Sequence, residues 1–396
     1  MKLFDEKIPD FTYQMIYFNV GSREKFIDIV KGMAILEVVL FHTQLMINEY
    51  SAKYEFTEIE FLNLISKYFS YGPYVFFLIS GYLMSNIYDS NILKSNSNQF
   101  SLRNFYIKRF ARIYPLWLFF LFLGYFQFKN FDFGYYAKSM TILGEYSNLT
   151  IFLLASTFLL FLVTPMWNWL VPGGWSIVSE VFFYILFPLI RKTKFDKLIV
   201  FLNILLVVAF VLTYTEQSWS SLDTHGILKG YLNLKLYNCL PFFIGGMLIH
   251  EISTGFRDLS QLAGNNLIKL NVISILGLLT ILPNANGSNS EAFVTLIGTL
   301  IVGLLVLKSN ILSLILIYLG KHSYFIYFFH FQLLLLIQSF YLNRNYGFVN
   351  SISLLLLLPI LTTLVLVVSM LFSSLSMNLF ENPSKRFIHK LFGVKA

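Results

Sequence analysis

Apolar stretches long enough to cross a lipid bilayer recur along nearly the whole chain, and they restrict the possible folds more than any other feature. A transmembrane helix needs roughly 17 to 25 mostly apolar residues, because it must cross ~30 Å of hydrocarbon. Of the 396 residues, 56% are hydrophobic and 13% are charged. Soluble domains carry about twice that charged fraction. The sequence therefore predicts an all-α fold, a polytopic integral membrane helix bundle.

We expect about ten transmembrane helices from these stretches. Their ranges are 26–47, 68–88, 110–128, 176–190, 198–214, 232–249, 267–282, 292–307, 323–341 and 352–375. Two further apolar segments are too short to cross: 150–163 is expected to be a re-entrant or laterally packed helix, and 311–319 to lie at the cytoplasmic interface. No polar stretch approaches the ~50 residues of a small soluble domain. Residues 1–396 are thus expected to form a single transmembrane domain with no appended soluble domain.

The distribution of lysine and arginine predicts the orientation of the bundle. Arg23 and Lys25 precede the first expected span, basic clusters follow the second, fourth and last, and a single arginine, Arg257, follows the sixth. Lysine and arginine are enriched in cytoplasmic loops. With about ten spans, these clusters and both termini face the cytoplasm, and no cleavable signal peptide is apparent. The net charge of +8 therefore reports orientation in a cytoplasmic (inner) membrane rather than binding of nucleic acid.

Motifs for metal, redox and nucleotide chemistry are missing from the sequence. A lone cysteine, Cys239, excludes an intrachain disulfide framework and offers no thiolate cluster for a metal. No HExxH, CxxC, Walker or dinucleotide-binding fingerprint is present. We therefore expect no bound metal.

Lys31 and His42 lie on one face of the first expected span. They are eleven residues apart, almost three full helical turns, and the rise between them is about 16 Å. Ionisable groups inside a membrane are costly to bury and are therefore functional candidates. The alternative, two polar residues satisfied by neighbours inside the bundle, stays open at this point.

The loop after the second span carries a cationic cluster. Arg109 and Arg112 are spaced i, i+3 and share a helix face. Guanidinium groups bind phosphate bidentately, so the pair suits a phosphate-bearing ligand from the cytoplasm. A contact with anionic lipid headgroups is the alternative. In the preceding span, Ser80 and Gly81 form a small-residue pair whose usual role is close helix packing.

Two later spans contain further polar candidates. Glu180 is expected in the outer half of the membrane, as is His42, and a carboxylate there would orient an imidazole or pair with a buried cation. Tyr324, Tyr327 and His330 fall at i, i+3 and i+6, close to one helical face. They are candidates for hydrogen bonds to a ligand, although aromatic stripes are more often part of a core.

Several fragments together resemble the membrane acyltransferase 3 family, which includes O-acetyltransferases of bacterial surface polysaccharides. The fragments are FIDIVKGMAILEVVLFH, FFLISGY, RFARIYP, WSIVSEVFFYILFP, GKHSYFIYFFH and the closing ENP. The family has an Arg or Lys separated from a His by ten residues, which corresponds to Lys31 and His42. Its WSxxxE element is intact at Trp175, Ser176 and Glu180.

The resemblance implies transfer of an acyl group, usually acetyl from cytoplasmic acetyl-CoA, to a glycan hydroxyl. It implies His42 as the catalytic base with Glu180 beside it, and Lys31, Arg109 and Arg112 as the residues that bind acetyl-CoA. Supporting candidates for substrate binding are Ser80, Trp175, Ser176, Tyr324, Tyr327 and His330. The implied partners are an acyl-CoA donor, a glycan acceptor and the lipid bilayer.

Two other classes of protein remain possible from the sequence. A multi-spanning transporter or flippase of a glycan or lipid precursor would also carry charges in its spans, but internal repeats are common in such proteins and none is clear here. A glycan polymerase would be expected to carry large extracytoplasmic loops, and those predicted here are short. Within the acyltransferase interpretation, direct transfer and a covalent histidine relay both remain open.

Overall fold

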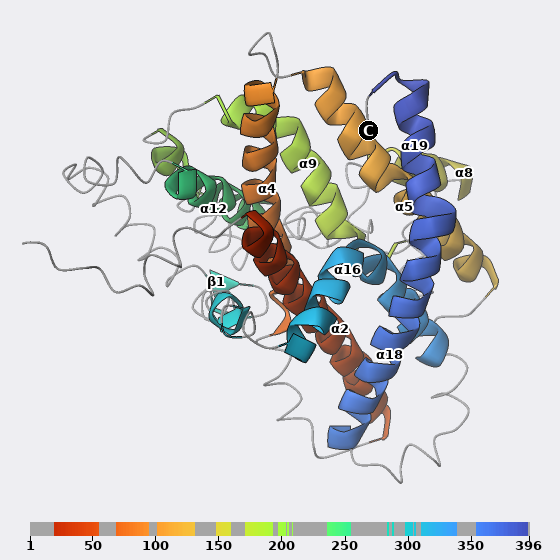
Figure 1. Cartoon of the computed structure of the whole chain (residues 1–396). Helices are drawn as coiled ribbons and strands as arrows, with labels where there is room; N and C mark the ends of the chain where they lie inside the picture. Colours follow the sequence, from red (N-terminus) through yellow and green to blue (C-terminus); the bar gives the residue numbers. More distant parts are fainter. Residues whose placement is uncertain are drawn as a thin grey trace, which may run out of the picture.

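Helices form nearly all of the described structure, which confirms the expected all-α class (Figure 1). This computed structural model describes residues 20–54, 69–94, 101–130, 148–159, 171–192, 197–202, 204–205, 208, 236–254, 283–284, 287–288, 298–303, 305, 310–338 and 354–394. The helices are α2 (Val20–Tyr54), α4 (Gly72–Lys94), α5 (Leu102–Asn130), α8 (Asn148–Ser156), α9 (Gly174–Ile190), α12 (Leu236–Thr254), α16 (Asn310–Ile337), α18 (Leu354–Ser376), the π-helical turn η4 (Met377–Glu381) and α19 (Asn382–Leu391). Two short strands, β1 (Pro283–Asn284) and β2 (Gly287–Ser288), pair antiparallel.

Many of the expected membrane spans coincide with helices. Helices α2, α4, α5, α9, α12, α16 and α18 cover most of the corresponding expected ranges. The ranges 198–214 and 292–307 are described only in part, and 267–282 lies outside the described residues. Within the described part, two segments are long and apolar enough to cross a membrane, Ile311–Ile337 and Leu356–Leu391. The ten-span topology therefore stays a prediction.

The short apolar segment 150–163 forms only one small helix in its described part. Helix α8 has nine residues and so extends roughly 14 Å, about half of a bilayer's hydrocarbon thickness. It packs on α5, where the indole nitrogen of Trp117 donates a hydrogen bond to the carbonyl oxygen of Ala155 at 3.0 Å. Its length agrees with a segment that does not cross. Segment 311–319, in contrast, is not a separate interfacial helix, because it is continuous with the rest of α16.

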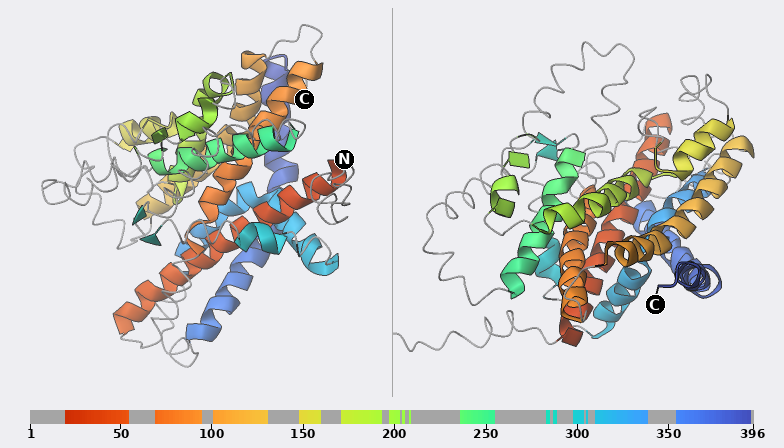
Figure 2. Two further views of the ribbon diagram at one scale, coloured as in Figure 1. Left: turned by 90° about the vertical axis from the view of Figure 1, so that its left-hand side faces the viewer. Right: turned by 90° about the horizontal axis from the view of Figure 1, so that it is seen from above.

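Close backbone contacts at glycines set which helices are neighbours. A Cβ atom on Gly32 of α2 would overlap the carbonyl oxygen of Leu316, and one on Gly320 of α16 would overlap that of Asp28. Only glycine permits such an approach, and small residues commonly allow it in membrane helices. The contact holds α2 against α16, as the views in Figure 2 also show. The polar residues predicted on these two helices therefore share one region of the bundle.

Helices α4 and α12 meet in the same way. A Cβ atom on Gly81 would overlap the carbonyl oxygen of Phe243, and one on Gly246 would overlap that of Leu78. The structure thus confirms a packing role for the small-residue pair that includes Gly81, and it leaves the Ser80 hydroxyl free to face another helix.

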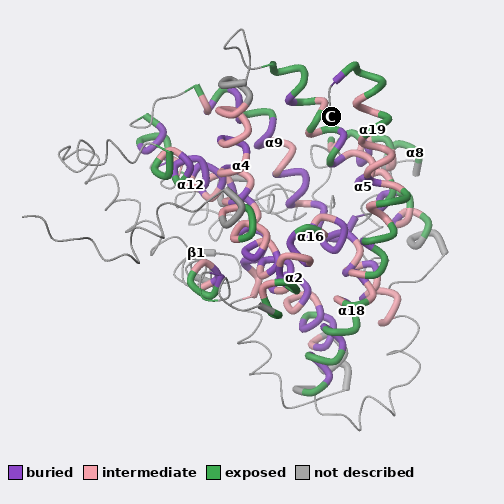
Figure 3. Tube along the Cα trace, viewed as in Figure 1, coloured by how far each residue is buried: buried purple, intermediate pink, exposed green. Residues whose placement is uncertain are grey.

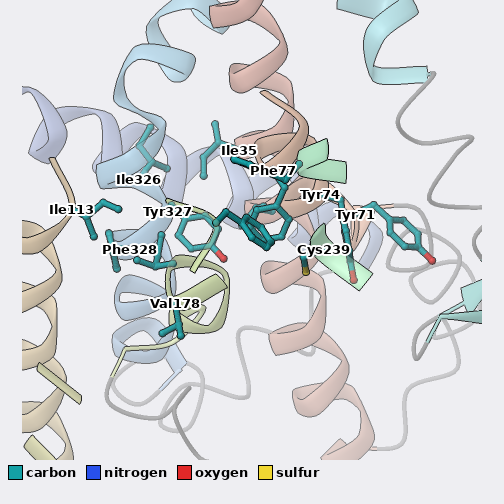
Figure 4. Close-up of a cluster of buried hydrophobic side chains, with 14 of the residues drawn as sticks. Ile35, Tyr71, Tyr74, Phe77, Ile113, Val178, Cys239, Ile326, Tyr327 and Phe328 are labelled. Carbon is teal, nitrogen blue, oxygen red and sulfur yellow. The ribbon is translucent and has the colours of Figure 1, made fainter. Parts of the chain in front are cut away.

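The buried core lies where these helices converge. Its largest fully buried side chains include Phe120, Phe183, Phe243 and Phe328, which come from four different helices. Figure 4 shows part of this cluster, in which Tyr327 lies among aliphatic and aromatic side chains. Outward-facing positions of α5 and α18 are apolar and exposed, and Figure 3 shows these exposed stretches along both helices. Such surfaces suit contact with lipid, because in a membrane the exterior is apolar too.

Charged side chains join several helix ends at one end of the bundle. Arg191, just after α9, lies 2.7 Å from Asp89 of α4 and also pairs with Glu251 of α12. His250 of α12 lies 2.8 Å from the same aspartate. Arg23, near the start of α2, donates a hydrogen bond to α12 in this region. The positive-inside rule predicts that this end faces the cytoplasm.

Candidate active site

Helices α2, α4, α5, α9 and α16 together line a pocket with an empty volume of about 690 Å³, counting its opening to solvent. The predicted site residues among its lining are Lys31, Ser80, Arg109, Arg112, Ser176, Glu180, Tyr324 and Tyr327. His42, Trp175 and His330 do not line it. Residues predicted on separate spans are thus brought to one cavity, and among the described residues three cationic side chains line it against one carboxylate.

Lys31 occupies the α2 side of the pocket. Its ammonium lies 3.3 Å from the carboxylate of Asp28, one helical turn earlier. Both side chains are partly exposed, so the lysine retains donors that Asp28 does not use. Lys31 also interacts electrostatically with Arg112 across the pocket. A negatively charged ligand would relieve that repulsion between like charges.

Arg109 and Arg112 enter the pocket from α5, on the shared face that their spacing predicts. The guanidinium of Arg109 lies 5.5 Å from the ring centre of Tyr184, and that of Arg112 lies 5.9 Å from the ring centre of Tyr324. Neither forms a salt bridge with a carboxylate of the described residues. The Nε atom of Arg109 is buried without a hydrogen-bond partner. These two side chains therefore offer donors to an anionic ligand.

Glu180 faces α4 rather than α2. Its Oε1 atom accepts a hydrogen bond from the Ser80 hydroxyl at 3.2 Å and another, very short one, from the hydroxyl of Tyr184. Arg112 interacts with the carboxylate electrostatically. No hydrogen bond joins Glu180 to His42, although the sequence predicted them side by side. The reason is packing, because Glu180 lies against Ser80 of α4 and near Arg112 of α5, while His42 is paired with a residue of α16.

His42 is paired instead with His330. The Nε2 atom of His330 lies 3.1 Å from Nδ1 of His42, and the ring centres are 5.1 Å apart. His330 is buried, with 1% of its surface exposed, and His42 is half-buried. The ring of Tyr327, which lines the pocket, lies 6.0 Å from the ring of His330. The histidine pair is thus connected to the pocket wall through Tyr327.

The chain matches a family model described as an acyltransferase domain over residues 24–375. The match covers most of the chain. This protein belongs to that acyltransferase family. No curated protein matches the chain, and no solved structure does.

Family membership confirms the resemblance inferred from the motifs and decides the class of protein. The protein is an acyltransferase and a membrane protein, rather than a transporter or flippase. The family match includes the histidine pair and all of the pocket-lining residues. In the described part of the acyltransferase, no three His, Cys, Asp or Glu side chains are arranged to hold a metal ion.

Trp175, predicted as a substrate-binding residue of the acyltransferase, packs among aromatic rings. Its ring centre lies 6.2 Å from that of Phe77 and 6.4 Å from that of Tyr74. The next residue, Ser176, lines the pocket and is hydrogen-bonded to Tyr327. Of the WSxxxE element, the serine and the glutamate therefore reach the cavity and the tryptophan supports the wall behind them.

Sequence reasoning missed three residues of the acyltransferase site. Asp28 lies at i−3 from Lys31, and Tyr184 lies at i+4 from Glu180. Both spacings place a partner on the same helix face, so the i, i+3 and i, i+4 rules identify them. Ser323 also lines the pocket, at the start of the stripe that continues with Tyr324. A small residue in an apolar span carries no comparable signal.

Proposed function

We propose that this acyltransferase moves an acetyl group from cytoplasmic acetyl-CoA to a hydroxyl of a cell-surface or lipid-linked glycan. The bundle would cross the cytoplasmic membrane about ten times as a single domain with both termini inside. Acetyl-CoA would enter from the cytoplasmic side, and the acceptor would meet the acyl group near the outer half of the membrane.

The observation that carries the proposal is that two guanidinium groups line the pocket without a salt bridge to any carboxylate of the described residues. CoA bears phosphates, and arginine binds phosphate through paired, charge-assisted hydrogen bonds. Arg109 and Arg112 form no salt bridge with a carboxylate of the described residues, although Arg112 interacts electrostatically with Glu180, and Lys31 adds a third cation. A cavity with this charge is unfavourable while empty and is suited to a polyanionic ligand. The aromatic and apolar remainder of the lining suits the pantetheine arm.

The distance from Lys31 to His42 along α2 matches the length of the pantetheine arm. Their separation along α2 is about 16 Å, comparable to an extended pantetheine chain. With the phosphates at the arginines, the thioester would lie toward His42. The Ser176 and Tyr327 hydroxyls line the route between them.

His42 would act as the base in a direct transfer. Its ring takes the proton from the acceptor hydroxyl, the hydroxyl oxygen attacks the thioester carbonyl carbon, and the carbon–sulfur bond breaks. The CoA thiolate then takes the proton. In a covalent relay, His42 first accepts the acetyl group and passes it to the hydroxyl. Both routes use the same imidazole, so both require His42.

Ligand-induced stabilisation of the purified full chain tests the donor assignment. Acetyl-CoA at 100 times its Kd should stabilise the folded protein by about 2.7 kcal/mol, which is measured as a rise in Tm. Arg112→Ala and Arg109→Ala should each weaken binding roughly 10- to 100-fold, the effect of losing a charge-assisted hydrogen bond. Lys108→Ala is the matched control, because Lys108 is exposed on the same helix and does not line the pocket.

Glycan analysis tests the reaction itself. Cells that carry His42→Ala at wild-type expression should lose the acetyl groups that the wild type adds. Unchanged acetylation in that variant would rule out His42 as base or relay. No stabilisation of the wild type by acetyl-CoA at millimolar concentration would rule out the donor site.

A further inference from the structure

The hydrogen bonds around the two paired histidines define where their protons lie. The Nδ1 atom of His330 is 2.8 Å from the carbonyl oxygen of Ile326, and Nδ1 of His42 is 2.9 Å from that of Val38. Each carbonyl belongs to the preceding turn of the same helix. A carbonyl oxygen only accepts hydrogen bonds, so each Nδ1 must carry a proton.

These proton positions determine the direction of the bond between the rings. A neutral His330 that is protonated at Nδ1 has a bare Nε2, and this atom lies 3.1 Å from Nδ1 of His42. The Nδ1 proton of His42 is therefore shared by two acceptors, Val38 and His330. The Nε2 atom of His42 carries the lone pair, and it has no hydrogen-bond partner in the described part of the chain.

We propose that His330 is a positioning residue: it holds His42 in the tautomer protonated at Nδ1 and so presents Nε2 of His42 as the atom that removes the acceptor's proton. For its chemical consequence this inference rests on the proposed acyl transfer. The tautomer itself does not depend on that reaction and can be observed separately.

The geometry around the pair supports a fixed ring orientation. The rings of Phe41 and Phe331 lie edge-on to the ring of His42 at 5.2 and 5.0 Å. His330 is almost fully buried, and its Nδ1 atom is hydrogen-bonded to a carbonyl oxygen of its own helix. The lone pair on its Nε2 atom is therefore directed at His42. Rotation of either imidazole would break a hydrogen bond inside an apolar region, which is unfavourable.

The same contact favours the proton transfer step. When Nε2 of His42 takes the proton from the acceptor hydroxyl, the hydroxyl's O–H bond breaks and an N–H bond forms. The ring is then positively charged, and its Nδ1–H bond to His330 becomes charge-assisted and stronger. The proton leaves Nε2 for the CoA thiolate when the carbon–sulfur bond has broken. His330 keeps its own proton throughout.

Nitrogen-15 NMR of the full chain with labelled histidine tests the tautomer directly. Protonated and bare ring nitrogens have well-separated chemical shifts, and signals are assigned by comparison with His42→Gln and His330→Gln. We expect Nδ1 of both residues to be protonated and Nε2 of both to be bare. A proton on Nε2 of His42 at neutral pH would overturn the inference.

Kinetics of three variants test the positioning role. His330→Phe removes the acceptor and should lower kcat about 10- to 100-fold with the KM for acetyl-CoA unchanged. His330→Gln offers an amide oxygen near the position of Nε2 and should restore most of the loss. His322→Phe is the matched control: His322 lies on α16, stacks on Tyr318 and does not line the pocket, so its kcat should be that of the wild type.

The outcomes separate this inference from the proposed function. Equal kcat in His330→Phe and the wild type would overturn the positioning role, as would a loss of kcat in His330→Gln as large as that in His330→Phe. If the wild type transfers no acetyl group but shows the expected tautomers, the proposed function fails and the assigned hydrogen-bond arrangement stands. If His330→Phe does not fold, the positioning role is tested by the tautomers of the wild type and by the kinetics of His330→Gln.

Discussion

The hydroxyl of Ser176 donates a hydrogen bond to the hydroxyl oxygen of Tyr327 at 2.6 Å, which joins the start of α9 to α16 at the wall of the pocket. Tyr327 in turn donates to the carbonyl oxygen of Gly173 at 3.1 Å. Gly173 has a φ of 76°, in the left-handed region that glycine adopts without strain. One tyrosine thus fixes both the turn that begins α9 and the serine that follows it.

Replacing this tyrosine should therefore destabilise the protein even though the ring remains. Tyr327→Phe removes the hydrogen bonds of Tyr327 to Ser176 and Gly173, but the Ser176 hydroxyl still lies 3.1 Å from the Gly173 carbonyl oxygen and keeps an acceptor. We therefore expect a moderate cost of about 1 kcal/mol in the free energy of unfolding. Ser176→Ala should cost less, because Tyr327 keeps its bond to Gly173. Thermal unfolding in detergent measures both changes. Equal Tm values for Tyr327→Phe and the wild type would show that the hydrogen bonds of Tyr327 to Gly173 and Ser176 contribute nothing to stability.

Replacement by alanine should destabilise the protein at one of two adjacent glycines of α12 and have little effect at the other. Gly246→Ala places a Cβ against the backbone of α4, and separating the two helices should cost about 1–3 kcal/mol or prevent folding. Gly245→Ala is the matched control, because nothing lies within 4 Å of its added Cβ. The fraction of monodisperse protein in size-exclusion chromatography and its Tm report the difference. Similar behaviour of both variants would contradict the close contact between α4 and α12.

Neutralising Glu180 should separate its structural and electrostatic contributions. Glu180→Gln keeps an acceptor for Ser80 and Tyr184, so its Tm should stay close to that of the wild type. Removing the one carboxylate among the described lining residues makes the pocket more positive and should tighten CoA binding several-fold, on the order of 1 kcal/mol. The measurement is the CoA concentration needed for half-maximal stabilisation at low salt.

A hydrophobic replacement at the same position gives the contrast. Glu180→Leu leaves the Ser80 and Tyr184 hydroxyls without an acceptor, which should cost about 1–3 kcal/mol in stability. Weaker CoA binding in Glu180→Gln than in the wild type would contradict this prediction. It would mean that the carboxylate makes a favourable contact with CoA rather than repelling its phosphates.

The charged cluster at the helix ends should depend most on its arginine. Arg191→Met leaves Asp89 and Glu251 close together without their shared cation, and we expect a loss of about 1–2 kcal/mol. Lys192→Met, at the next position, changes an exposed side chain and should leave Tm unchanged. If added salt raised the Tm of Arg191→Met toward that of the wild type, repulsion between the carboxylates would account for the loss.

The sequence by itself determined which candidate site residues lie on each helix and which of them share a helix face. Apolar length and helical periodicity put Lys31 on α2, Arg109 and Arg112 on one face of α5, and Tyr324 and Tyr327 together on α16. The order of the motifs also identified the family. These are local properties, because 3.6 residues per turn fixes which side chains of one helix share a face.

Only the tertiary structure decided which helices face one another. His42 is paired with His330, 288 residues away, rather than with Glu180, which is instead bound by Ser80 across 100 residues. No periodicity within a helix encodes such pairs. They follow from close backbone contacts at glycines such as Gly32, where the partner's surface determines the approach, and that surface exists only once the bundle has assembled.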